Sequence, residues 1–246
     1  MKYHYLEKYL MAPTHPITIS VIGCGGTGSY VVTQLAKLAV ALYETRKIDL
    51  SVTVYDNDVV EAHNVGRQLF SPSDIGRNKA EVIIERVNRF YGFNWESKNE
   101  KISESPKNNI VITCVDNVKT RKLIKKRAHP MFTDHRSQFY WLDFGNSKDY
   151  GQYVLSSLYK IDQPKGDYFV GKLKTVFELF GKMKEDKSEP SCSMLESLSK
   201  QDLFINLQLA TAGVSLLWKL LKDHRIEYHG QFMNLDTGNS RPLHIS

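Results

Sequence analysis

A glycine-rich turn between an apolar run and a long helical pattern constrains the fold of this chain most. Residues 17–22 read I-T-I-S-V-I, which predicts a fully buried strand. Gly23, Gly25 and Gly28 follow in G-x-G-x-x-G spacing, and a helix is predicted from about residue 26 to 43. Backbone N–H groups at such a helix start, with the positive end of the helix dipole, favour an anionic phosphate. The pattern therefore predicts a strand, loop and helix that bind a nucleotide.

Strands and helices continue to alternate along the chain. Further strands are predicted at 51–55, 109–115, 139–144, 152–159 and 231–235, and helices at 77–91, 118–129 and 193–222. This alternation predicts an α/β, Rossmann-like three-layer fold: a largely parallel sheet with helices on both faces and later antiparallel strands. The lysine-rich interval 162–191 is interrupted by glycines and a proline, and we interpret it as a long, mobile loop with at most short helical pieces. We expect residues 1–246 to form a single domain.

Composition and cysteine usage narrow the class of protein. The net charge of +6 would suit nucleotides, acidic proteins or nucleic acid, but the basic run at 121–127 is typical of a solvated face. We therefore expect no nucleic-acid partner. Three cysteines without a C-x-x-C pair exclude a paired-cysteine zinc site and a disulfide framework. The chain shows no signal core and no uninterrupted apolar span, so we predict a cytoplasmic protein without a membrane segment or zinc.

An acidic residue after the second predicted strand marks where a ribose could bind. Asp56 directly follows the run 51–55, and a carboxylate there can accept hydrogen bonds from ribose hydroxyls. It lies further beyond Gly28 than the acid of a plain NAD-binding unit, which the longer helix and loop explain. This residue alone leaves NAD and ATP equally open.

The next polar cluster distinguishes the two nucleotides. Asn64, Arg67, Gln68 and Lys79 fall within sixteen residues. Two cations and two amides can neutralise a triphosphate, which carries more charge than a dinucleotide pyrophosphate. Asp116 ends another predicted strand and precedes Asn117, so its carboxylate can hold a magnesium ion that bridges phosphate oxygens. The set favours Mg-ATP over NAD.

Four motifs in this order resemble the ThiF/MoeB/ubiquitin-activating superfamily. They read V-I-G-C-G-G-T-G-S, D-N-D-V-V-E-x-x-N-V-G-R-Q, D-I-G-x-x-K-A and C-V-D-N, and extend over residues 17–120. A weaker likeness continues to residue 145 and again at 190–221. In detail, N-V-G-R-Q-L-F-S-P, P-S-C-S and Q-D-L-F-I-N are similar to ThiF-like proteins of the plasmid-associated PRTRC cassette.

The resemblance implies adenylation of a protein C-terminus. Members bind Mg-ATP and attack its α-phosphate with the terminal glycine carboxylate of a small ubiquitin-like (β-grasp) protein, giving an acyl-adenylate and pyrophosphate. Carried over residue by residue, Gly23, Gly25 and Gly28 form the phosphate loop, Asp56 holds the ribose, Asn64, Arg67 and Lys79 contact the phosphates, Gln68 supports that loop, and Asp116 takes the magnesium. We add Gly26, Asp58 and Asn117 to the nucleotide-binding set, and assign catalysis to Arg67, Lys79 and Asp116. The resemblance also implies a homodimer.

Cys192 is a second candidate for chemistry. It lies in E-P-S-C-S-M-L-E, where Ser193 and Glu196 form a capping box at a predicted helix start. A helix N-terminus lowers the pKa of a thiol and favours the nucleophilic thiolate. The loop before it resembles the crossover loop that carries a transfer cysteine in some relatives. Our hypothesis is that Cys192 accepts the activated partner; the alternative is an incidental loop cysteine.

One departure from the family keeps other functions open. Many dimeric members supply an arginine from the N-terminal segment of the partner subunit, but residues 1–16 contain none here. Either Lys2 or Lys8 substitutes, or turnover suffers. Two alternatives therefore remain: an ATP-binding partner or assembly protein without turnover, and an NAD-dependent oxidoreductase. The last would leave the phosphate-contacting cations and Asp116 without a role.

Overall fold

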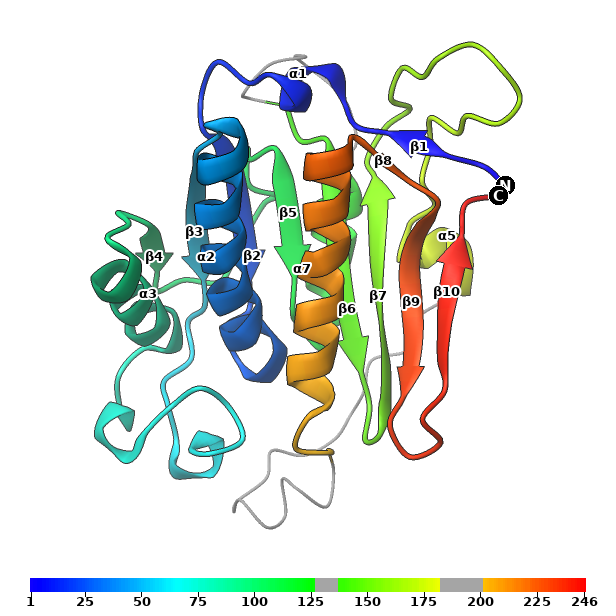
Figure 1. The fold of residues 1–246 in the computed structure, drawn as a ribbon. Helices are drawn as coiled ribbons and strands as arrows, with labels where there is room; N and C mark the ends of the chain where they lie inside the picture. The colour runs from blue at the N-terminus through cyan, green and yellow to red at the C-terminus, as the bar shows by residue number, and fades with distance from the viewer. Residues whose placement is uncertain (127–136, 182–200) are drawn as a thin grey trace.

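An eight-stranded mixed sheet forms the centre of the molecule, which a computed structural model describes for residues 1–126, 137–181 and 201–246 (Figure 1). The strands lie in the order β10-β9-β7-β6-β5-β2-β3-β4. Their bounds are β2 Ile17–Ile22, β3 Leu50–Tyr55, β4 Glu96–Lys98, β5 Ile110–Thr113, β6 Tyr140–Asn146, β7 Tyr150–Ser157, β9 Tyr228–Asn234 and β10 Ser240–His244. A separate two-stranded sheet pairs β1 (His4–Tyr5) with β8 (Arg225–Ile226).

The half of the sheet from β6 to β4 is parallel, as the alternating pattern predicts. β2 lies inside it and pairs with β3 on one side and β5 on the other. The sequence of β2 is almost entirely apolar because helices or other core residues cover both faces of this strand. β7, β9 and β10 continue the sheet antiparallel. The carboxyl ends of β2, β3 and β5 meet at one edge, so the residues that follow these strands gather there.

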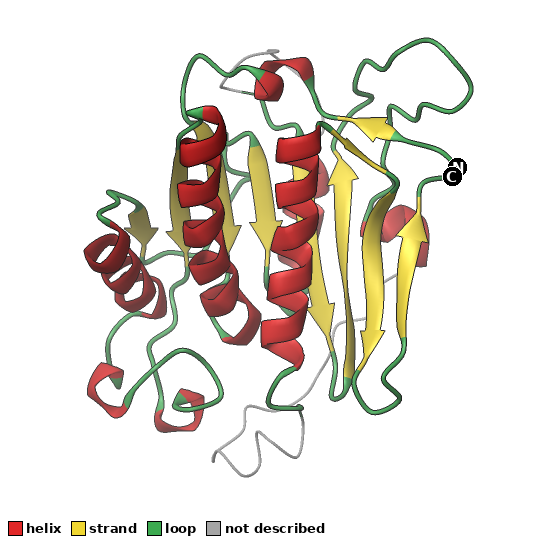
Figure 2. Ribbon diagram, viewed as in Figure 1, coloured by secondary structure: helices red, strands yellow, loops and turns green. Residues whose placement is uncertain are grey.

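Helices cover both faces of the sheet and complete the three layers (Figures 1 and 2). The helices are α1 Lys8–Met11, α2 Gly26–Arg46, α3 Lys79–Tyr91, α4 Val118–Lys126, α5 Val176–Phe180 and α7 Ile205–Asp223, with 3-10 turns at Ala62–Asn64 and Pro72–Asp74. α2, α3 and α7 lie in front of the sheet in Figure 1, and α4 and α5 lie behind it. α2 and α7 pack side by side along their lengths. The predicted fold class is therefore confirmed.

Local sequence signals explain where the helices begin and end. α2 ends at Lys47, whose φ of 56° is left-handed and whose N–H donates to the Tyr43 carbonyl. α3 begins two residues later than predicted because the Asn78 side chain caps it by accepting from the Glu81 N–H. β5 ends at Thr113, earlier than the predicted 115, because the next residues leave the sheet to pack on the glycine loop.

The structure corrects the prediction for the last helix and adds strands that were not predicted. The described part of the predicted helix 193–222 becomes helical only at Ile205, since residues 201–204 form bends; residues 193–200 lie outside the described residues. In the interval 162–191, the described residues include α5, and residues 182–191 lie outside them. β1, β4, β8 and β10 were not predicted.

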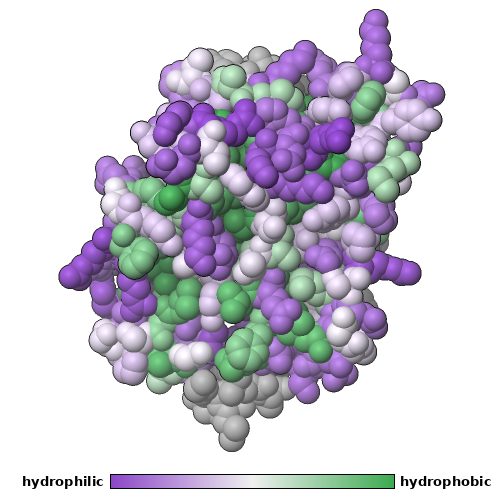
Figure 3. All heavy atoms as spheres, in the orientation of Figure 1, coloured by the Kyte–Doolittle hydropathy of each residue, from purple (hydrophilic) through white to green (hydrophobic). Residues whose placement is uncertain are grey.

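The core lies on both faces of the sheet around large aromatic side chains. Trp141, Tyr140 and Tyr153 of β6 and β7 are buried, as are the leucines that join α2 to α7. On the face that α2 and α7 cover, hydrophobic residues lie in small groups among hydrophilic ones (Figure 3). Among the described residues, the helices fall short of the length and apolar character that a membrane span requires.

Candidate nucleotide-binding site

The glycine loop between β2 and α2 has a backbone that only glycine can adopt at two positions. Gly23 has φ +91°, and a Cβ there would lie 2.6 Å from the Cys114 carbonyl oxygen. A Cβ at Gly28 would lie 2.0 Å from the Gly23 carbonyl oxygen. The Gly23 N–H donates to the Tyr55 carbonyl at 2.9 Å. The glycine spacing therefore produces a tight turn braced by the ends of β3 and β5.

Asp56 braces this loop from the end of β3. Its Oδ2 accepts the Cys24 backbone N–H at 2.5 Å, and its Oδ1 accepts the Asp58 N–H at 2.8 Å. Burial raises the pKa of the Asp56 carboxyl above its usual range, and the two N–H donors oppose this. The predicted ribose-binding residue therefore lies directly against the phosphate loop.

Lys79 comes to the same edge of the sheet from the start of α3. Its Nζ lies 3.6 Å from Asp58 Oδ2, and only 12% of its side chain is exposed. The Asn78 amide nitrogen donates to the carbonyls of Asp56 and Asp58 at 2.9 and 3.2 Å, so the capping residue also ties α3 to the end of β3. The structure thus brings three predicted residues, Asp56, Asp58 and Lys79, together.

The loop carrying Asn64, Arg67 and Gln68 is folded on itself and turned toward the glycines. Asn64 Oδ1 accepts the Glu61 N–H at 2.9 Å, and the Asn64 carbonyl accepts the Gln68 N–H at 2.9 Å. A Cβ at Gly25 would lie 3.8 Å from Gln68 Oε1, a buried atom that has no hydrogen-bond partner in the part of the chain that the structure describes. Asn64 therefore stabilises its own loop. Gln68 lies against the glycine loop, and its side-chain oxygen is available to accept a hydrogen bond.

The Arg67 guanidinium is half-buried and incompletely paired. Its Nη1 donates to Gln201 Oε1 at 2.7 Å, while its Nε is buried and finds no partner among the described residues. Burial lowers the pKa of this side chain, because an environment shielded from water disfavours the charged form. A buried, unsatisfied cation costs free energy that an anionic ligand would recover.

Asp116 and Asn117 follow β5 on the other side of the loop. The Val115 side chain and the Cys114 carbonyl contact the position of a Gly23 Cβ, so Asp116 is one residue from the loop and is exposed. Asn117 caps α4: its Oδ1 accepts the Thr120 N–H at 2.8 Å. Arg121 of α4 reaches back to the Asp116 carbonyl at 3.5 Å.

The described site residues meet the chemical demands of a bound nucleotide phosphate. The glycine turn offers backbone where a side chain would not fit. α2 begins there with Gly25 at its N-cap, which gives the N–H groups of the first turn no side-chain cap. Arg67 and Lys79 supply positive charge, while Asp56 and Asp116 supply carboxylates at the ends of neighbouring strands. Phosphate, ribose and a magnesium ion can be accommodated by this combination.

Two of the three cysteines lie at the glycine loop and at the end of β5. Cys24, inside the glycine loop, is fully buried, and burial raises its pKa. Burial also raises the pKa of Cys114, which directly follows β5, so neither thiol is poised as a thiolate. Cys192 lies outside the described residues.

Three further polar residues at the site were not found from the sequence. Gln201 and Asn206 precede and begin α7, and they contact Arg67 and Thr27 across more than 130 residues of chain. Arg121 pairs with Asp143 inside the sheet. The Q-D-L-F-I-N run contains Gln201 and Asn206, so the resemblance marked the segment, but nothing local predicts their partners.

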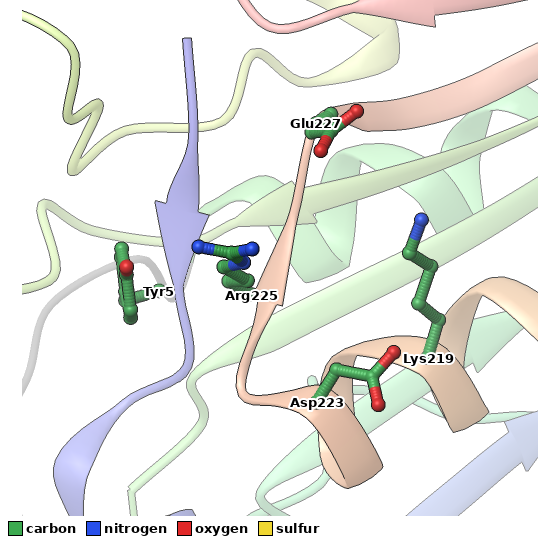
Figure 4. Close-up of a pocket in the computed structure, with 5 residues that line it drawn as sticks. All are labelled: Tyr5, Lys219, Asp223, Arg225 and Glu227. Carbon is green, nitrogen blue, oxygen red and sulfur yellow. The ribbon is translucent and has the colours of Figure 1, made fainter.

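A hollow of about 480 Å³ lies at the opposite end of α7 (Figure 4). Tyr5, Lys219, Asp223, Arg225 and Glu227 line it. α7 begins beside the glycine loop, and a 19-residue helix is about 28 Å long, so this hollow is separate from the site. Its two acids and two cations balance, which gives no preference for an anionic ligand.

Comparisons with known proteins agree with the fold. The ThiF family profile matches residues 14–244. A tRNA threonylcarbamoyladenosine dehydratase of Haemophilus influenzae is 36% identical over 115 residues, covering 42% of this chain and 40% of that protein. Ubiquitin-activating enzyme E1 1 of Candida albicans is 26% identical over 126 residues, covering 46% of this chain and 12% of that protein.

Solved structures share the fold at low sequence identity. E. coli MccB, solved with ATP, superposes with a TM-score of 0.60 at 17% identity, over 94% of this chain and 63% of MccB. PaaA superposes with a TM-score of 0.61 at 14% identity, over 93% of this chain and 64% of PaaA. The chain thus spans less than two thirds of each of these proteins. Because the family profile covers nearly all of the chain, this protein belongs to the ThiF family.

Proposed function

We propose that this protein is an ATP-dependent adenylyltransferase that activates the C-terminal glycine carboxylate of a small ubiquitin-like protein. The observation that carries the proposal is the convergence of Asp56, Gln68 and Lys79 on a glycine loop, with the half-paired Arg67 cation beside it. Its family supports it, as do the ubiquitin-activating enzyme among its relatives and the ATP in the MccB structure.

The proposed reaction uses each residue through its position. Asp56 receives the ribose hydroxyls, and the N–H groups at the start of α2 receive the phosphates. A carboxylate oxygen of the partner attacks the α-phosphorus, and the bond from that phosphorus to the bridging oxygen breaks. The products are an acyl-adenylate and pyrophosphate. Arg67 and Lys79 stabilise the negative charge that develops during this step.

Asp116 would hold a magnesium ion together with phosphate oxygens of the substrate. Magnesium is commonly bound by one or two carboxylates plus substrate phosphates, and a single exposed carboxylate beside the loop fits that pattern. When bound, the ion would neutralise phosphate charge. In this proposal Asn117 acts on nucleotide binding indirectly. Its side chain caps α4, and this cap holds the turn that carries Asp116.

We further propose a homodimer in the cytoplasm and transfer of the activated tail to Cys192. These follow from the family resemblance and from the helix-start motif around Cys192. Comparison of Cys192→Ser with the parent chain tests the transfer. If Cys192→Ser adenylates the partner and transfers it as well as the parent chain does, the acceptor of the activated tail is a residue other than Cys192.

Ligand-dependent thermal unfolding tests the nucleotide. A ligand at one hundred times its dissociation constant adds about 2.7 kcal/mol, or about 5–11 °C in midpoint for a chain of this size. We expect this shift with Mg-ATP, a smaller one with ATP plus chelator and none with NAD. Lys79→Ala should abolish most of it, whereas Lys37→Ala, on the exposed side of α2, should not. A shift with NAD alone would contradict the proposal.

ATP–pyrophosphate exchange tests the reaction. Peptides with a free C-terminal glycine should stimulate exchange, and the same peptides with an amidated C-terminus should not, because the attacking carboxylate is missing. Binding of Mg-ATP without exchange for any candidate tail would instead support the alternative of an assembly protein without turnover.

A further inference from the structure

A chain of hydrogen bonds joins Arg67 to the start of the phosphate-loop helix. Arg67 Nη1 and Asn206 Nδ2 both donate to Gln201 Oε1, at 2.7 and 2.9 Å. Asn206 Oδ1 in turn accepts from Thr27 Oγ1 at 2.7 Å and from Asn146 Nδ2 at 2.6 Å. This relay connects the 61–70 loop, the segment entering α7, the first turn of α2 and the end of β6.

The direction of every bond in the relay follows from the arginine. A guanidinium can only donate, so Gln201 must turn its carbonyl oxygen toward Arg67. Asn206 must then present its amide nitrogen to the same oxygen. Its own carbonyl oxygen is left to accept from Thr27 and Asn146. Rotating either amide by half a turn would therefore place two donors or two acceptors face to face.

The relay is fixed in place by burial. Asn206 is 1% exposed and Thr27 is 8% exposed. A Cβ at Gly26 would lie 2.8 Å from Asn206 Nδ2, so the loop backbone and this amide are in direct contact. Buried polar networks with satisfied members specify one arrangement, because each broken bond leaves an unpaired group.

Among the residues that the structure describes, the partner of Arg67 is an amide and not a carboxylate, and this has a consequence for charge. A carboxylate would form a charge-assisted, bidentate pair and neutralise the guanidinium. Gln201 orients Nη1 through one bond to a neutral acceptor, which does not compensate the positive charge. Within the described ranges, Nε has no hydrogen-bond partner. The geometry is that of a cation held in place for an anion.

We propose that Gln201 and Asn206 are positioning residues that hold Arg67 beside the first turn of α2 for the phosphates of the nucleotide. This inference rests on the proposed nucleotide site. It assigns the Q-D-L-F-I-N run a role: Gln201 holds the cation without neutralising it, and Asn206 sets the orientation of Gln201 from the phosphate-loop helix.

Three variants separate orientation from charge. Gln201→Glu should neutralise Arg67 and weaken Mg-ATP binding at least tenfold, since a charged hydrogen bond is worth about 1.5–3 kcal/mol. Gln201→Ala should weaken it less, because the charge remains but its orientation is lost. Asn206→Asp should resemble Gln201→Ala, because its second acceptor oxygen would face Gln201 Oε1 and turn that amide away from Arg67. Gln208→Glu, on the exposed side of α7, is the matched control.

Adenosine distinguishes positioning from a general structural effect. Because adenosine lacks phosphates, its affinity, measured by calorimetry, should stay within about twofold of the parent in all four variants. Parallel loss of adenosine and Mg-ATP, or Mg-ATP binding by Gln201→Glu equal to the parent, would overturn the relay while leaving the nucleotide site intact. A parent chain that binds neither ligand would overturn the proposed function and the relay together. Urea midpoints of each variant identify any that fail to fold.

Discussion

Gly28 shows how one missing side chain permits the phosphate loop. A Cβ at this position would overlap the Gly23 carbonyl oxygen, which lies 2.0 Å away on rigid backbone. We expect Gly28→Ala to destabilise the protein by about 3 kcal/mol and to abolish the Mg-ATP shift, because the turn must open. Gly92→Ala is the matched control: its φ is +74° but nothing lies within 4 Å of a Cβ, so it should cost about 1 kcal/mol and keep the shift. Urea unfolding with and without Mg-ATP measures both.

Asp56 uses both carboxylate oxygens as acceptors, so its isosteric amide is not a conservative replacement. In Asp56→Asn, an amide nitrogen would face either the Cys24 or the Asp58 N–H. We expect a loss of about 1–3 kcal/mol in the free energy of unfolding, because one N–H loses its acceptor and the other loses its bond to a charged oxygen. Asp49→Asn, exposed before the start of β3, should change stability little. Equal stability of Asp56→Asn and the parent in urea would show that the loop needs no brace from Asp56.

At the scale of elements, a buried ion pair fixes α4 on the sheet. Arg121 Nε donates to Asp143 Oδ1 at 2.8 Å, Arg121 Nη2 donates to the Phe144 carbonyl at 2.8 Å, and both side chains are at most 5% exposed. Burial raises the pKa of Asp143, and Arg121 opposes this. Arg121 also holds the Asp116 carbonyl. The pair therefore determines where the Asp116 turn lies relative to the glycine loop.

Breaking this pair from one side should be costly. We expect Arg121→Met to lose about 3–5 kcal/mol, because Asp143 would stay buried without its cation. The double variant Arg121→Met/Asp143→Asn should recover part of that loss, since the uncompensated charge is then removed. Lys122→Met, on the exposed side of α4, should have almost no effect. Urea unfolding of the four proteins gives the comparison. A double variant that is no more stable than Arg121→Met would contradict the argument.

The elements differ in how far the sequence predicts them, for physical reasons. β2 and α2 were predicted almost to the residue because an apolar run, glycines and helical spacing act within one short stretch. β4 and β10 were missed because they are short, exposed edge strands, and Pro242 in β10 argues against a strand. In the described part of the predicted helix 193–222, α7 begins at Ile205, since Asp202 caps the N–H groups of Phe204 and Ile205 locally.

The same distinction holds in the candidate site. Asp56, Gln68 and Lys79 follow from strand ends and a loop motif that adjoin the glycines in sequence. Asn206 could not be found in this way, because its bond to Thr27 joins residues 179 apart and depends on how α2 and α7 pack. A local pattern predicts which groups can meet a ligand, while tertiary packing decides what orients them.

Across the whole molecule, the two ends of the sheet hold different parts of the chain. The carboxyl ends of β2, β3 and β5 carry the candidate site, and the N-terminal segment covers the amino end (Figure 1). That segment docks on its own chain: β1 pairs with β8, Leu6 and Leu10 are buried, and Tyr3 pairs with the 168–170 loop. Lys8 therefore lies far from the glycine loop of the same chain. Its predicted substitution for an N-terminal arginine stays a prediction.

His4 anchors this segment from inside the core. Its Nδ1 lies 2.7 Å from the Val170 carbonyl oxygen, so that nitrogen carries the proton. Its Nε2 then accepts from the Tyr140 hydroxyl at 3.0 Å, and the same hydroxyl oxygen accepts the Glu7 N–H at 3.1 Å. His4 is fully buried, and burial lowers its pKa to about 4, with His229 contributing in the same direction. The neutral imidazole is therefore the form that the fold requires.

Acidification should release this anchor within a defined pH window. The unfolded chain binds a proton at His4 near pH 6.5 and the folded chain only near pH 4, so stability falls as the pH falls between these values. We expect His4 to account for a loss of about 2 kcal/mol between pH 7 and pH 5. His4→Gln should be less stable at pH 7 but should lack this part of the pH dependence, whereas His244→Gln, on exposed β10, should keep it. Urea unfolding at both pH values measures the slope. If the free energy of unfolding of His4→Gln and of the parent falls equally between pH 7 and pH 5, other groups cause the acid sensitivity. The N-terminal segment would then be held by Leu6, Leu10 and the β1–β8 pairing alone.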